Sequence, residues 1–255
     1  MSKLLITSGC SFSECISIHL DTWPRHLARK LEEHGYDKHI SCAMGSQGNG
    51  LISRGPMYEV TKALKNGYKP EDILVGIMWS HSSRFDYHCE HPQTLSWGAE
   101  NKHHWMVNPR AFVDGASNSW VIGNVHWDSI EFSTFVKFFH SNIGQSIISL
   151  EHILRTQYFL KSKNVPYFFT NFVNNNIVEE KYVDHVEIKY LLDELDKEQY
   201  LPVTSEHGWL IENSETKEQY LKDHGDIEWI HPKTHHHKEF IDKIVYPWLQ
   251  QKRYV

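Results

Sequence analysis

Short, continuous apolar stretches recur along the chain, each followed by small or polar residues. The clearest, residues 73–79, has the sequence ILVGIMW and comes directly after Pro70-Glu71-Asp72. Apolar runs of this length are typical of parallel strands that are covered on both faces. On the same pattern we predict further strands over residues 4–8, 39–43 and 165–171.

Four helices are predicted from apolar positions that recur with helical spacing. They cover residues 22–35, about 51–64, about 143–161 and the segment that opens at His231-Pro232. In the first of them Pro24 stands near the start, where its missing N–H costs nothing, and Gly35 is placed to end the helix. Pro247 is expected to end or kink the last one.

The alternation of strands and helices predicts an α/β fold. We expect a three-layer α/β/α arrangement of the flavodoxin-like type, with a central parallel sheet and right-handed crossovers. Residues 85–140 break the alternation and are rich in Trp, His, Asn and Gly, so we interpret them as an irregular insertion or elaborated loop after the third strand. The whole chain, residues 1–255, is expected to form one domain.

Composition refines this picture mainly by exclusion. A formal net charge of −6 argues against a general nucleic-acid binder, because such proteins present a basic face to phosphates. No apolar run approaches the roughly 20 residues that span a bilayer, and the run near Met1 ends at Thr7, without the length or cleavage site of a signal peptide. We therefore expect a soluble, cytoplasmic or otherwise unexported protein whose four cysteines stay reduced.

Residues that carry chemistry collect directly after the predicted strands. The segments are Gly-Cys-Ser-Phe-Ser (9–13), Gly-Ser-Gln-Gly-Asn-Gly (45–50), Ser-His-Ser-Ser-Arg (80–84) and, before the last helix, Asp-Ile-Glu-Trp-Ile-His-Pro (226–232). In an open parallel sheet, loops at the carboxyl ends of the strands form the binding crevice. A serine in such a loop becomes a nucleophile when an adjacent base takes its proton and a third polar group orients that base.

The content and order of these four segments resemble the SGNH hydrolase superfamily, also called the GDSL-type esterases and lipases. Residues 9–13 are similar to the family's Gly-Asp-Ser-x-Ser block, with Cys10 in place of Asp. Residues 228–232 are similar to its Asp-x-x-His block, with Glu228 in place of Asp. The third block departs most, because Trp79-Ser80-His81 follows Gly76 where the family has Gly-x-Asn-Asp.

The resemblance implies a role for each of the matching residues. Ser11 would attack the substrate, His231 would take and return the proton, and Glu228 would orient the imidazole, with Asp226 as the alternative acid. The backbone N–H groups of Ser11 and Gly48 would donate to the oxyanion.

The missing asparagine leaves one oxyanion donor to be assigned. We expect Ser80 to replace it and to point toward Ser11, while Gly45, Asn49 and His81 are alternatives. Each assignment has a structural alternative. Ser11 could serve simply as a helix cap, His231 as the first residue of a helix, and the glycines as turn residues that need positive φ.

The 19 histidines invite a metal interpretation, which the spacing does not favour. Successive helical residues point about 100° apart, so His235, His236 and His237 cannot all face one ion, and we expect them to be solvated. A second cluster matches no zinc pattern: His88, Cys89, His91, His103 and His104. A set of aromatic residues in the insertion forms either a wall for sugar stacking or the insertion's own core: Tyr87, Trp97, Trp105, Trp120 and Trp127.

The sequence thus predicts a serine esterase of the SGNH type that uses no cofactor and no metal. Its substrate is expected to be a small-molecule or glycan ester, with a small acyl group on carbohydrate as the first choice. The alternative is a catalytically degenerate SGNH-fold module that binds glycans or takes part in an assembly. The missing asparagine motivates it, because loss of one oxyanion donor lowers the rate by about 10²- to 10³-fold.

Overall fold

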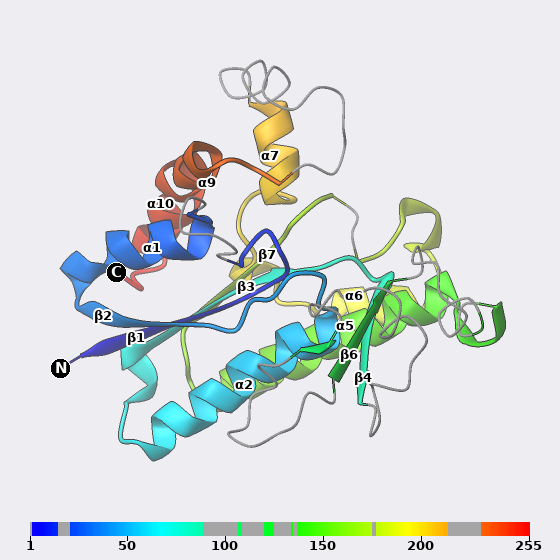
Figure 1. The fold of residues 1–255 in the computed structure, drawn as a ribbon, viewed down its shortest axis with the longest axis horizontal. Helices are drawn as coiled ribbons and strands as arrows, with labels where there is room; N and C mark the ends of the chain where they lie inside the picture. The colour runs from blue at the N-terminus through cyan, green and yellow to red at the C-terminus, as the bar shows by residue number, and fades with distance from the viewer. Residues whose placement is uncertain are drawn as a thin grey trace.

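The structure is a computed structural model, and it describes residues 2–14, 21–88, 107–108, 120–124, 134, 137–174, 177–213 and 231–255. Its framework is a four-stranded parallel sheet in the order β2-β1-β3-β7 (Figure 1). The strands are β1 (Lys3–Ser8), β2 (Tyr36–Ser41), β3 (Ile73–Trp79) and β7 (Tyr167–Asn171). This is the beginning of the flavodoxin-like order, in which the chain reverses direction across the sheet between β1 and β3.

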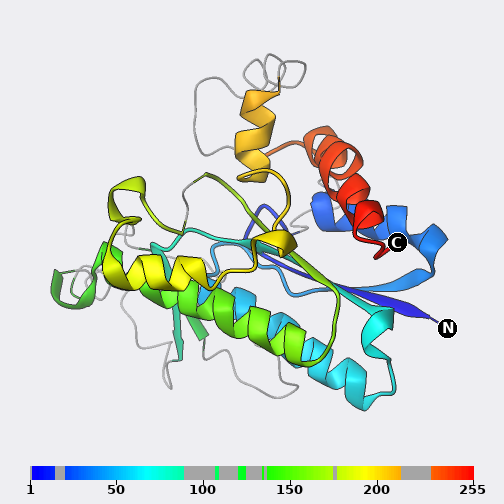
Figure 2. The ribbon, with the colours of Figure 1, turned by 180° about the vertical axis from the view of Figure 1, so that it is seen from behind.

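Helices cover both faces of the sheet, so the fold is the predicted three-layer α/β/α type (Figures 1 and 2). One face carries α1 (Trp23–Leu31), α9 (Thr234–Phe240) and α10 (Tyr246–Gln251). The other carries α2 (Asn49–Lys65), α5 (Asn142–Ser162) and α6 (Val186–Asp193). The short helix α7 (Glu206–Glu212) lies next to α9.

Two apolar clusters hold the layers together, and the strands alternate between them. Leu5, Leu74 and Phe168 belong to the cluster under α1 and α9, whereas Ile6 and Val75 belong to the one under α2 and α5. This alternation of side chains across a strand explains why the central strands are apolar along their whole length. All seven residues of β3 are buried.

Gly76 shows why a glycine stands in the middle of this central strand. A Cβ atom at residue 76 would come within 2.5 Å of Cζ of Phe168, the residue that pairs with it on β7. The glycine therefore lets the phenyl ring lie directly against the backbone of β3.

Most predicted elements are confirmed, and the differences have physical causes. β3 has the predicted bounds, and α2 and α5 begin and end within two residues of the prediction. β2 starts earlier than expected, at Tyr36. The prediction missed its first residues because this edge strand exposes Asp37 and Lys38 and so lacks a continuous apolar signal.

The insertion after β3 is more regular than expected in its described parts. β4 (Arg84–His88), β5 (Val107–Asn108) and β6 (Trp120–Asn124) form a second, antiparallel sheet in the order β4-β6-β5. These strands are short and mix polar with apolar residues, so they gave no period-2 pattern of useful length.

Pro247 does not end the C-terminal helix. A π-helical segment, η7 (Ile241–Val245), joins α9 to α10, and Pro247 falls in the first turn of α10. A wider turn before a proline accommodates the ring and the missing N–H. Short 3-10 segments complete the chain: η1 (Glu32–His34), η2 (Pro70–Asp72), η5 (Glu180–Tyr182) and η6 (Lys197–Gln199). Among the described helices, none has the length and apolar character needed to cross a bilayer.

Candidate active site

Ser11 lies in a tight turn directly after β1, at the carboxyl edge of the parallel sheet. The carbonyl of Cys10 accepts hydrogen bonds from the backbone N–H groups of Ser13 and Glu14, at 2.9 and 3.0 Å. Cys10 and Phe12 are buried on either side, whereas Ser11 is only half-buried. The turn thus fixes the backbone of Ser11 while its side chain reaches the surface.

His231 approaches this turn from the other end of the chain. Its Nε2 lies 2.6 Å from Oγ of Ser11, a hydrogen-bond distance between residues 220 positions apart in sequence. In the tautomer that leaves Nε2 unprotonated, the serine hydroxyl donates this bond. The buried Pro232 follows, and α9 begins at Thr234. The structure therefore brings together the two residues on which the sequence-based hypothesis depends.

The protein environment favours the neutral form of this imidazole. Burial, followed by the electrostatic effects of Arg84 and His237, lowers the pKa of His231 below its usual 6.5. The Phe12 ring covers one side of the imidazole at a centroid distance of 4.8 Å, and Phe172 packs against Phe12 at 5.0 Å. A neutral imidazole at the serine is the state that a general base requires. Glu228 and Asp226, the two predicted acids, lie outside the described residues.

Gly48, a predicted oxyanion donor, has an N–H group that a carboxylate already binds. Its N–H donates to Oδ1 of Asp86 at 2.8 Å, while Oδ2 of the same carboxylate accepts from the N–H of Leu51 at 2.9 Å. Asp86 therefore caps the start of α2 and occupies the N–H group that was expected to serve an oxyanion.

Gly45, an alternative donor in the prediction, lies next to Ser11. A Cβ at Gly45 would be 3.8 Å from Cβ of Ser11. The Gly45 N–H donates to the carboxylate of Glu14, so an anionic oxygen already occupies this group. Within the described part of the chain, nothing accepts a hydrogen bond from the N–H of Ser11 itself.

Ser80 is not placed as expected. The residue is completely buried, and its Oγ accepts a hydrogen bond of 3.0 Å from Nη1 of Arg84. Asn49 holds the Ser80 backbone: its Nδ2 donates to the carbonyl at 3.0 Å and its Oδ1 accepts from the N–H at 2.8 Å. Asn49 thus stabilises the backbone at the end of β3. A ligand would have to displace Arg84 to reach the Ser80 hydroxyl.

His81, the last alternative, lines a cavity of about 390 Å³ with residues of α7. Its Nδ1 accepts from the N–H of Ser83 at 3.0 Å, which places the imidazole proton on Nε2.

Arg84 is a site residue to which the sequence gave no role. Its guanidinium carbon lies 5.4 Å from the ring centroid of Phe172, and its charge acts on His231. The only sequence signal was its position at the end of the polar segment after β3.

The histidine run differs from the prediction. His236 and His237 are buried, and only His235 is exposed. Nδ1 of His237 lies 2.6 Å from Oε1 of Glu206, which is also fully buried. Across the described residues, no group of His, Cys, Asp or Glu side chains could hold a metal ion. Cys89, His91, His103, His104 and the side chains of the insertion's aromatic residues lie outside the described set.

No protein-family model and none of the curated proteins matches the chain. Among solved structures it is similar to the protein YXIM of Bacillus subtilis, with 14 % identity, a TM-score of 0.49, and coverage of 99 % of this chain and 57 % of that one. It is also similar to a protein named TesA, with 12 % identity, a TM-score of 0.47, and coverage of 98 % and 99 %. The chain thus spans little more than half of YXIM, and we rest no functional argument on likenesses below a TM-score of 0.5.

Proposed function

We propose that the protein is a serine hydrolase of the SGNH type that cleaves an ester. The observation that carries this proposal is the 2.6 Å contact between Oγ of Ser11 and Nε2 of His231. It lies at the carboxyl edge of a parallel sheet, where α/β proteins bind their ligands. A serine and a histidine from opposite ends of the chain meet there with an imidazole whose neutral form is favoured.

In the proposed reaction, Oγ of Ser11 attacks the ester carbonyl while its proton passes to Nε2 of His231. The imidazolium then protonates the leaving alkoxide, and an acyl-serine remains. Water, deprotonated by the same imidazole, attacks the acyl carbon and releases the acid and the free serine. Glu228, or Asp226 in its place, would hold Nδ1 of His231.

The oxyanion is best served by two backbone donors near the nucleophile. We assign the N–H of Ser11 and that of Gly45, which is adjacent to Ser11 and already binds a carboxylate oxygen of Glu14. Glu14 would leave Gly45 when the substrate oxyanion forms.

A small acyl group on carbohydrate remains our proposed substrate class. The cavity beside Arg84 supports it, because Gln145 and Ser149 line that cavity with an amide and a hydroxyl group suited to a hydroxyl-rich ligand.

The second candidate is a binding module that has kept the fold without the reaction. The observation that favours it is the engagement of two predicted oxyanion donors: Gly48 donates to Asp86, and the Ser80 hydroxyl lies buried under Arg84. If Gly45 does not replace them, little transition-state stabilisation is left.

A fluorophosphonate probe and a small activated ester test the two candidates. We expect the probe to label Ser11, and Ser11→Ala and His231→Ala to remove both labelling and turnover. Ser162→Ala and His235→Ala are matched controls, since both residues are exposed and neither contacts Ser11. Equal labelling of wild type and Ser11→Ala contradicts the hydrolase proposal, and a wild type that is neither labelled nor active favours the binding module.

A further inference from the structure

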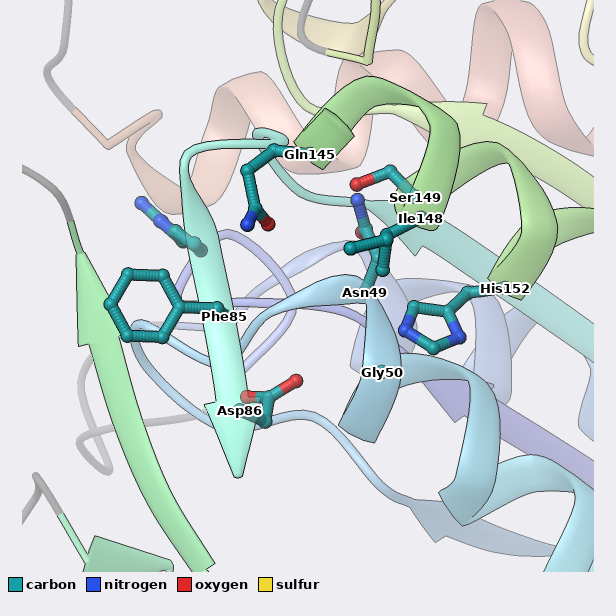
Figure 3. Close-up of a pocket in the computed structure, with 9 residues that line it drawn as sticks. Asn49, Gly50, Phe85, Asp86, Gln145, Ile148, Ser149 and His152 are labelled. Carbon is teal, nitrogen blue, oxygen red and sulfur yellow. The ribbon is translucent and has the colours of Figure 1, made fainter. Parts of the chain in front are cut away.

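A cavity of about 400 Å³ lies between the start of α2, strand β4 and the first half of α5 (Figure 3). Phe85 and Ile148 contribute apolar surface. The polar groups that line it are Asn49, Arg84, Asp86, Gln145, Ser149 and His152. Such a mixture of apolar walls and a few polar groups is typical of small-molecule sites.

Gly50, in the first turn of α2, lets polar side chains approach the backbone closely. A Cβ at this residue would lie 3.1 Å from Oδ2 of Asp86, 3.3 Å from Nε2 of His152 and 3.6 Å from Nη1 of Arg54. Figure 3 shows Asp86 and His152 directed toward Gly50 from β4 and α5. Three polar side chains thus converge where any other residue would place its own side chain.

The charges around this cavity are predominantly positive. Arg84 lines it, Arg54 reaches Gly50, and Arg155 lies on the same side of α5 and donates to Ser53 at 2.6 Å. The lining itself holds one arginine, Arg84, and one carboxylate, Asp86, so the positive character of the surroundings comes from Arg54 and Arg155. Within the described chain, no carboxylate oxygen lies within 4.0 Å of the guanidinium of Arg84 or Arg155.

His152 is neutral in this cavity, chiefly because it is buried. Burial, followed by the charges of Arg155 and Arg54, lowers the pKa of His152 to about 4. The imidazole is therefore neutral at pH 7 and offers a hydrogen bond without adding charge. Because both oxygens of Asp86 accept backbone N–H groups at the start of α2, its negative charge is already engaged.

Arg84 connects this cavity to the Ser11–His231 pair. Its guanidinium lies over the Phe172 ring, which packs against Phe12, which in turn packs against His231. One face of Arg84 therefore borders the cavity while its charge reaches the imidazole. Arg84 thus belongs both to the cavity and to the surroundings of the Ser11–His231 pair.

We propose that this cavity binds an anionic group, a carboxylate or a phosphate, carried by the ester that Ser11 attacks, with Arg84 as its principal ligand. The planar guanidinium suits both anions, since each offers two oxygens to its paired donors. His152, Gln145 and Ser149 supply further hydrogen bonds. The inference rests on the proposed function for the ester, but the anion site itself does not require catalysis.

The kinetic test compares two esters of one phenol, a hemiglutarate and a valerate, which differ only in the terminal group of the acyl chain. We expect wild type to prefer the hemiglutarate in kcat/KM by about tenfold or more at low ionic strength, as a hydrogen bond to a charged group implies. Arg84→Gln should bring this ratio close to one, and Arg84→Lys should leave an intermediate value. Arg253→Gln, at the exposed C-terminal end, is the matched control and should keep the wild-type ratio. A wild-type ratio near one, or an unchanged ratio in Arg84→Gln, overturns the proposal.

A binding test separates this inference from the proposed function. Calorimetry with glutarate and with inorganic phosphate, on wild type, Arg84→Gln and Arg84→Lys, needs no turnover. Binding of glutarate alone assigns a carboxylate and binding of phosphate alone assigns a phosphate, provided that Arg84→Gln weakens it by about tenfold or more. Such binding in a protein that cleaves no ester supports the anion site while the proposed function fails. Absence of binding for both anions to the wild type overturns the inference even if esters are cleaved.

Discussion

The imidazole of His231 packs against the phenyl ring of Phe12, with centroids 4.8 Å apart and planes inclined by 38°. This contact covers one side of an imidazole whose other contact, through Nε2, is the hydroxyl of Ser11. A covered imidazole is harder to protonate, because its charged form loses hydration. The electrostatic effects of Arg84 and His237 act in the same direction.

The first prediction concerns the acid limb of the pH profile, the pH range in which kcat/KM falls as the solution becomes more acidic. A histidine acts as a base only when it is unprotonated, and the pKa of His231 is lowered, so kcat/KM should lose activity only below pH 6.5. Arg84→Gln removes one of the charges that lower this pKa, so its acid limb should shift to higher pH. An NMR titration of His231 in both proteins checks the assignment independently of turnover. An acid limb that does not move, or moves to lower pH, contradicts it.

The second prediction concerns Asn49, which the sequence offered as an oxyanion donor. Its fully engaged amide satisfies both backbone groups of Ser80 in a buried place, so Asn49→Ala should lower the free energy of unfolding by about 2–4 kcal/mol. Asn49→Asp keeps an acceptor for the Ser80 N–H but loses the donor to the Ser80 carbonyl, so it should also lower the free energy of unfolding strongly. Denaturant unfolding measures both, with the exposed Asn142→Ala as control. A loss of activity at unchanged stability would instead indicate a direct catalytic role.

The sequence singled out Ser11 and His231, which the structure brings into contact, but not their surroundings. Ser11 and His231 stand in short motifs next to predicted element boundaries, so spacing alone marks them. Both N–H groups already bind a carboxylate, so the choice between Gly45 and Gly48 depends on which glycine lies next to Ser11. Asp86, which binds Gly48, lies on a strand that the pattern did not reveal. Tertiary hydrogen bonds of this kind have no sequence period.

In the fold, too, features set by the local pattern could be predicted, whereas features set by tertiary contacts could not. β3 was predictable because both of its faces are covered, which makes every residue apolar. His235, His236 and His237, in α9, were expected to be exposed to solvent. His237 is nevertheless buried, and Glu206 on α7 offsets the free-energy cost of its burial by pairing with it. Only the packing of α7 against α9 creates that partner.

The third prediction follows from this buried pair. Glu206→Ala removes the partner of His237 and leaves an imidazole nitrogen without a hydrogen bond in the interior, which should lower the free energy of unfolding by about 3–5 kcal/mol. Glu206→Gln keeps an acceptor of similar size and should cost less. Because α9 follows His231 closely, Glu206→Ala should also slow probe labelling of Ser11. Glu212→Ala, on the exposed end of α7, is the control for both measurements, and a Glu206→Ala protein as stable as this control contradicts the prediction.

The last prediction concerns Asp86, whose pKa is raised to about 6, chiefly by burial and against the lowering effect of the Gly48 and Leu51 N–H groups. A carboxyl with a folded pKa above its usual 3.8 prefers to be protonated in the folded protein. Its contribution to stability is therefore present at low pH and is lost as the pH rises from about 4 through 6.

Asp86→Asn cannot ionise, so the free energy of unfolding of the wild type relative to this variant should fall between pH 3.5 and 7, by at most about 3 kcal/mol. Asp21 supplies the opposite control, because a hydrogen bond from Arg29 lowers its pKa, and wild type should gain stability over Asp21→Asn as the pH rises. Urea unfolding of the three proteins at several pH values measures both slopes. If the Asp86 and Asp21 comparisons change in the same direction with pH, burial does not govern the charge of Asp86, and its negative charge would be present in the cavity beside Arg84 at every pH at which esters are assayed.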